Sequence, residues 1–72
     1  MSHDKIARMT NQIAKFFESQ PKPDKASCVA AHVKEFWEPR MLDELAALLK
    51  EGGTGLSPLA LEGSKRVFAQ TT

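Results

Sequence analysis

The sequence predicts an all-α fold, a compact bundle of three to four short helices with no sheet, formed as a single small domain over residues 1–72. Two observations predict this class. Apolar residues recur every three or four positions in four segments, as in amphipathic helices. Proline, glycine or a capping residue separates each segment from the next. No stretch alternates apolar and polar residues, and no Asn-Gly or Asp-Gly pair indicates a hairpin.

The first two helices are predicted on either side of a proline-rich break. The first covers about residues 3–19, with Ser2 as a possible N-cap. Its apolar stripe consists of Ile6, Met9, Ile13, Phe16 and Phe17. Residues 20–23 end it, because proline disfavours helix in the residue that precedes it. The second helix is expected over about residues 24–37, with Asp24 as N-cap. Its apolar face consists of Ala26, Val29, Ala30, Val33, Phe36 and Trp37.

The third and fourth helices carry equally clear boundaries. Pro39 fits the first position of the third helix, and Gly52-Gly53 fit its C-terminal cap. Its apolar stripe consists of Met41, Leu42, Leu45, Leu48 and Leu49. For the fourth helix, Ser57 is the expected N-cap and Pro58 the first residue, with Leu56 and Leu61 placed as a hydrophobic staple. Its small and apolar residues between positions 59 and 68 spread over about 200°, wider than the ~100° of a surface helix. Two interpretations explain this extra apolar width: the helix has a second face for a partner, or it is a short, frayed helix.

Composition argues against several classes of protein. Ten Lys and Arg against nine Asp and Glu leave a net charge of +1, whereas nucleic-acid-binding domains carry a basic excess. No apolar run approaches the ~20 residues of a membrane span, and no secretory signal opens the chain, so a cytoplasmic location is expected. Cys28 is the single cysteine, which excludes an internal disulfide and a Cys-rich metal site. A chain of this length that has neither a disulfide nor a structural metal is a candidate for stabilisation by a partner.

No pattern of residues predicts catalysis. Cys28 and His32 are four positions apart on a helix and could touch, but a thiolate–imidazole pair also needs a cleft and oxyanion donors. Residues 52–55 (GGTG) lack the lysine and the preceding strand of a phosphate-binding loop. A helix-turn-helix formed by the second and third helices would present an acidic helix to phosphates. We therefore expect no enzymatic activity, no metal or cofactor in this chain, and no nucleic acid or membrane partner.

Two features are unusual for an isolated monomer. Arg40 lies in the first turn of a helix, where the macrodipole disfavours a cation. Asn11 and Gln12 lie in the middle of a helix, where asparagine is a mediocre helix former. Two interpretations remain open. Arg40 pairs with a nearby carboxylate and the two amides form a solvated polar patch, or all three side chains anchor the chain on another subunit. Trp37 fits either the core or an interface.

Four motifs, in order along the chain, carry a resemblance to a known family. They are residues 8–14 (RMTNQIA), 30–33 (AAHV), 36–41 (FWEPRM) and 52–59 (GGTGLSPL). Together they resemble the delta subunit of NAD-dependent, molybdenum-containing formate dehydrogenases over roughly residues 5–62. Residues 15–25 and the chain after Gly63 add no signal to this resemblance.

The resemblance implies a cofactor-free accessory subunit of a cytoplasmic complex that passes electrons from formate to NAD. In such complexes the catalytic alpha subunit carries molybdopterin guanine dinucleotide and iron–sulfur clusters, while beta and gamma subunits carry flavin mononucleotide and further clusters. The delta chain is expected to support assembly or stability of the alpha subunit. The alternatives are a transient chaperone for cofactor insertion and a small helical DNA-binding regulator. The expected partner-binding residues are Asn11, Gln12, His32, Phe36, Trp37, Pro39, Arg40, Gly53, Gly55, Leu56, Pro58 and Leu59.

Overall fold

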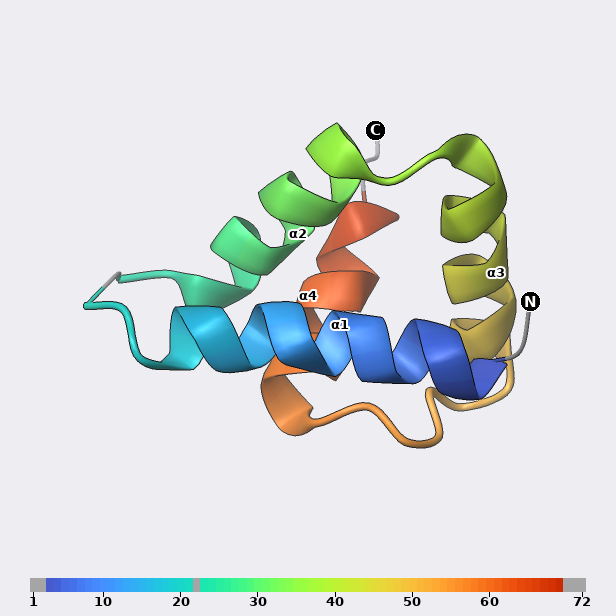
Figure 1. Ribbon diagram of the computed structural model, residues 1–72, viewed down its shortest axis with the longest axis horizontal. Helices are drawn as coiled ribbons and strands as arrows, with labels where there is room; N and C mark the ends of the chain where they lie inside the picture. The colour runs from blue at the N-terminus through green and yellow to red at the C-terminus, as the bar shows by residue number, and fades with distance from the viewer. Residues whose placement is uncertain (1–2, 22, 70–72) are drawn as a thin grey trace.

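The computed structural model describes residues 3–21 and 23–69, and these residues form four α-helices and no strand (Figure 1). The helices are α1 (His3–Glu18), α2 (Lys25–Phe36), α3 (Pro39–Lys50) and α4 (Pro58–Val67). In Figure 1, α1 lies in front, α3 stands at one end and α4 lies behind α1. The predicted all-α fold is confirmed. The possible N-cap Ser2 lies outside the described residues.

The predicted starts of α2 and α4 are confirmed by hydrogen bonds to their capping side chains. The Asp24 carboxylate accepts a hydrogen bond from the backbone N–H of Ser27 at 3.2 Å, which caps α2. The Ser57 hydroxyl oxygen accepts one from the N–H of Ala60 at 3.3 Å, which caps α4. Pro39 and Pro58 occupy the first turns of α3 and α4, where a missing N–H leaves no helical bond unmade. These local signals fix where the helices begin.

Two glycines end α3 as predicted. The N–H of Gly53 donates to the carbonyl of Leu48 at 2.9 Å, and the N–H of Gly52 donates to the carbonyl of Leu49 at 3.0 Å. This is a Schellman motif, which requires a positive φ at the first residue after the cap, Gly52, where φ is 101°; Gly53 follows with a φ of 68°. A Cβ at Gly53 would also lie 2.6 Å from Leu61 Cδ1. The positive φ therefore favours glycine at position 53, and a larger residue would also displace the end of the Leu61 side chain.

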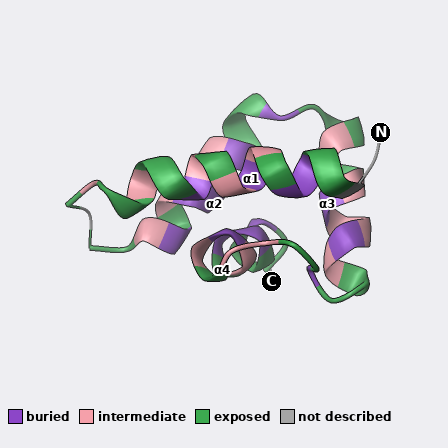
Figure 2. Ribbon diagram, turned by 60° about the horizontal axis from the view of Figure 1, so that its bottom comes forward, coloured by how far each residue is buried: buried purple, intermediate pink, exposed green. Residues whose placement is uncertain are grey.

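The core lies where the helices face one another, as Figure 2 shows. Its largest fully buried apolar side chains are Ile6, Leu45, Val29 and Val33. Helix α4 contacts all three other helices, and α2 most extensively. It presents the small buried residues Ala60, Gly63, Ser64 and Val67. The broad apolar arc predicted for this helix is thus largely used inside the domain, so the interpretation that it forms a partner face is wrong for these residues.

Candidate docking site

An apolar groove runs between α1 and α2. It is lined by Met9, Gln12, Ile13, Phe16 and Phe17 from α1, and by His32 and Trp37 from α2 and its C-terminal cap. Phe36 joins this surface because its ring lies against that of His32, with centroids 4.8 Å apart. We call these eight residues the aromatic groove.

The rings of the aromatic groove form a continuous row from one helix to the other. Phe16 meets Phe17 edge-on with centroids 5.1 Å apart, and Phe17 meets His32 at 6.3 Å, an arrangement that aromatic quadrupoles favour. The two ends of the row are exposed to solvent, Phe16 at 59% and Phe36 at 66%. Apolar side chains gathered in this way on a surface are typical of a site that binds a protein or an apolar ligand.

The predicted partner-binding residues differ in exposure and place. The exposed ones are Gln12, Phe36, Pro39, Arg40, Gly55 and Pro58. The half-buried ones are Asn11, His32, Leu56 and Leu59, and the buried ones are Trp37 and Gly53. The aromatic groove brings together Gln12, His32, Phe36 and Trp37. Trp37, only 8% exposed, is mainly a core residue.

Sequence reasoning missed the contribution of α1 to this surface. Met9, Ile13, Phe16 and Phe17 were all predicted on the apolar stripe of the first helix; Met9, Ile13 and Phe17 do pack against the core as well as line the groove, whereas Phe16 is exposed. Adjacent residues on a helix point about 100° apart, so Phe16 and Phe17 can at most lie at the two opposite edges of one apolar stripe. That adjacency was the signal that one of the two phenylalanines would be exposed.

Asn11 has a structural role on the other side of α1. Its side-chain amide donates to the carbonyl of Gly55 at 2.8 Å, and its carbonyl oxygen accepts from the N–H of Ser57 at 2.8 Å. The amide thus fastens the turn before α4 to α1, which explains an asparagine in mid-helix. Its neighbour Gln12 is exposed. Arg40 is exposed too and makes no ion pair within the described residues.

Replacing Asn11 with alanine is expected to lower the free energy of unfolding by about 1–3 kcal/mol, because the N–H of Ser57 loses its acceptor at a half-buried position. The matched control is Gln12→Ala on the same helix, where the side chain is exposed and we expect a change within about 0.5 kcal/mol. Urea unfolding followed by circular dichroism measures both. Equal stability of the two variants would contradict the clamp assigned to Asn11.

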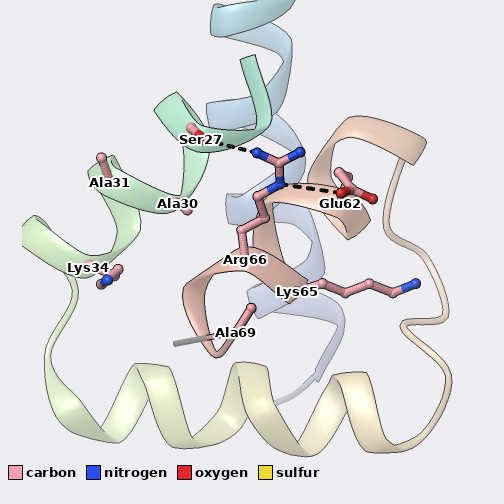
Figure 3. A pocket seen from close by; sticks show the side chains of 8 residues that line it. All are labelled: Ser27, Ala30, Ala31, Lys34, Glu62, Lys65, Arg66 and Ala69. Carbon is pink, nitrogen blue, oxygen red and sulfur yellow. Dashed lines mark hydrogen bonds and ion pairs between the residues drawn. The ribbon is translucent and has the colours of Figure 1, made fainter. Parts of the chain in front are cut away.

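A second, polar groove lies between α2 and α4 (Figure 3). It is lined by Ser27, Ala30, Ala31, Lys34, Glu62, Lys65, Arg66 and Ala69. The Arg66 guanidinium reaches across it, with Nη1 2.8 Å from Asp24 Oδ2 and 3.0 Å from Ser27 Oγ, and Nε 3.3 Å from Glu62 Oε2. This network ties the end of α4 to the start of α2. Among the described residues no group of three or more His, Cys, Asp or Glu side chains could hold a metal ion.

Because of this network, the stability of the folded chain is expected to decrease at acid pH. The hydrogen bond from the Ser27 hydroxyl, and next that from Arg66, lower the pKa of Asp24. A carboxylate whose pKa is lower in the folded state stabilises that state at pH values above its unfolded-state pKa, which is near 4. This stabilisation is lost as the pH falls through the folded-state pKa. We expect the melting temperature of Asp24→Asn to fall less steeply than that of the wild type below about pH 4. Asp43→Asn, at an exposed carboxylate outside this network, is the control; parallel curves for wild type and Asp24→Asn would contradict the effect.

The fold and the groove define a class of protein: small all-α domains that keep a row of aromatic side chains at the surface. More specifically, the chain belongs to the NADH-dependent formate dehydrogenase delta subunit family, FdsD, whose family model matches residues 5–63. Comparison with curated proteins and with solved structures gives no significant match. The resemblance seen in the sequence is confirmed, and the family name marks its members as subunits of a formate dehydrogenase complex. In the part of the chain that the structure describes, no helix is both long and apolar enough to cross a bilayer.

Proposed function

We propose that this chain is a non-catalytic accessory subunit of a cytoplasmic, molybdenum-containing formate dehydrogenase, and that it binds the catalytic alpha subunit to support its assembly or stability. Membership in the delta subunit family supports a place in such a complex. The single observation that carries the docking role is the aromatic groove, whose two end residues, Phe16 and Phe36, are more than half exposed.

Docking can act through binding free energy alone. At their observed exposures the two phenylalanines leave roughly 250 Å² of apolar surface to be buried, worth about 6 kcal/mol before the entropy of association is subtracted. A protein that binds only the folded form of its partner stabilises that form by about 2.7 kcal/mol at a hundred times the dissociation constant. This chain would thereby lengthen the lifetime of the folded alpha subunit without contributing a reacting group.

In this proposal the redox chemistry belongs to the partner subunits. The alpha subunit is expected to carry molybdopterin guanine dinucleotide and iron–sulfur clusters, and the beta and gamma subunits flavin mononucleotide and further clusters. The delta chain holds none of these groups. Its contribution is the surface that it offers to the complex.

Affinity purification of the chain, tagged at its C-terminus, from its native host grown with formate tests the proposal. We expect an active complex that reduces NAD with formate, contains molybdenum and flavin, and holds this chain at a fixed ratio. A strain that lacks the chain should yield a complex with a shorter half-life of activity or a lower molybdenum content. Recovery of the chain only with an inactive, metal-free alpha subunit would favour a transient chaperone. A chain that elutes alone would contradict the proposal.

A further inference from the structure

Helix α1 has a groove along each flank. The aromatic groove follows one flank, and the other is lined by Asp4, Ala7, Arg8, Asn11, Gln12, Lys15 and Gly55. Gln12 lines both grooves, so its exposed side chain stands on the ridge between them. We infer that the docking surface straddles α1, and that its occupant is an element of another subunit with apolar side chains over the aromatic groove and acidic side chains over Arg8 and Lys15.

The second flank has the charge that this inference requires. Arg8 and Lys15 are seven residues apart, so they lie on the same side of α1 about 10.5 Å apart along its axis. Both are exposed, and neither side chain makes a hydrogen bond or an ion pair within the described residues. Asp4 is the one carboxylate residue in the lining of this groove. The flank is therefore net positive, and an acidic surface is its electrostatic complement.

The exposed apolar area of the aromatic groove is too small for a stable interface by itself, so the partner must extend beyond this groove. Its two exposed phenylalanines offer roughly 250 Å², whereas a stable interface buries about 800 Å² on each partner. The second flank of α1 is the adjoining surface, reached across Gln12. A second copy of this chain fits poorly, because a symmetric pair would set each net positive flank against another positive flank or against the apolar groove, and neither is its electrostatic complement. The inference rests on the proposed function and adds to it the place of the interface and the chemistry of the partner.

The polar groove between α2 and α4 is also cationic but lacks two of these features. Its Arg66 is engaged by Asp24 and Glu62, and no aromatic residue lines it. Lys34 and Lys65 in that groove are exposed and, within the described residues, make no ion pair, as is true of Arg8 and Lys15. Replacing Lys34 and Lys65 with glutamate therefore gives a control variant, which changes the net charge as much as replacing Arg8 and Lys15 does, but on a different surface.

The test measures binding of the full-length chain to the formate dehydrogenase complex purified from a strain that lacks this chain. The double variant Arg8→Glu/Lys15→Glu is compared with Lys34→Glu/Lys65→Glu and with wild type at low and high salt. We expect the first variant to bind at least about tenfold more weakly than wild type at low salt, and the second to bind within about twofold. Wild-type affinity should fall with salt, while that of the first variant should change little or rise, because attraction has been replaced by repulsion. Circular dichroism checks that both variants remain helical.

Two results would overturn the inference while leaving the proposed function intact. One is loss of binding in Lys34→Glu/Lys65→Glu with normal binding by Arg8→Glu/Lys15→Glu. The other is dimerisation of the wild-type chain through α1. The molecular mass in solution would then be that of a dimer for wild type, and Arg8→Glu/Lys15→Glu would change it while Lys34→Glu/Lys65→Glu would not. A wild-type chain that does not bind the complex at all would overturn the proposed function, and the inference with it.

Discussion

Replacing Gly63 with alanine is expected to lower the free energy of unfolding by about 1–3 kcal/mol, the usual penalty for overpacking a core. A Cβ at position 63 would lie 2.6 Å from Val29 Cγ1, 2.7 Å from Val29 Cβ and 3.3 Å from the carbonyl oxygen of Ala26. Val29 is fully buried, so it has no free space into which to move. Alanine is the better helix former by about 1 kcal/mol, but the clash lies at the main contact between α2 and α4 and outweighs that gain.

The neighbouring residue supplies the control. Ser64 is also fully buried, and its hydroxyl has no hydrogen-bond partner among the described residues. Ser64→Ala removes an unsatisfied polar group and improves helix propensity, so we expect stability to stay equal or to rise by up to about 1 kcal/mol. Thermal unfolding should then separate the two alanine variants, at about 4–8 °C for each kcal/mol in a domain of this size. A Gly63→Ala variant as stable as Ser64→Ala would show that α2 and α4 are not packed this closely.

Removing both exposed rings of the aromatic groove should weaken binding to the formate dehydrogenase complex by at least about 2 kcal/mol, or roughly thirtyfold, which is the size of an interface hot spot. The variant is Phe16→Ala/Phe36→Ala. Both rings are more than half exposed, so the free chain should lose far less stability than it would from a substitution in the core. Binding and folding can therefore be read separately.

A third phenylalanine allows a matched control for this prediction. Phe68, at the end of α4, is 43% exposed and does not line the aromatic groove. Phe68→Ala should bind the complex as the wild type does. Titration of each variant against the purified complex gives the dissociation constants. If Phe68→Ala weakens binding as strongly as the double variant, the aromatic groove is not the anchor.

The fold could be predicted from the sequence because its boundaries are set by local interactions. Asp24 and Ser57 cap helices through bonds to backbone three residues away, and the glycine pair ends α3 through bonds to the preceding turn. Such interactions depend on neighbouring residues, which the sequence displays directly.

The docking site was predicted only in part because exposure depends on contacts between distant residues. Phe36 and Trp37 were expected on one face, yet Phe36 is 66% exposed and Trp37 only 8%. Which of two adjacent side chains is covered depends on where α1 lies, and the apolar period of α2 does not contain that information. Asn11 likewise finds its partners, Gly55 and Ser57, 44 and 46 residues later in the chain.

Hydroxyl-radical footprinting of the full chain, free and bound to the purified complex, tests the docking role most directly, because aromatic side chains are modified in proportion to their exposure. Phe16, Phe36 and Phe68 are all exposed in the free chain and act as three reporters in one experiment. We predict that Phe16 and Phe36 are protected in the complex while Phe68 is modified as before. Protection of Phe68, with Phe16 and Phe36 unchanged, would contradict docking through the aromatic groove.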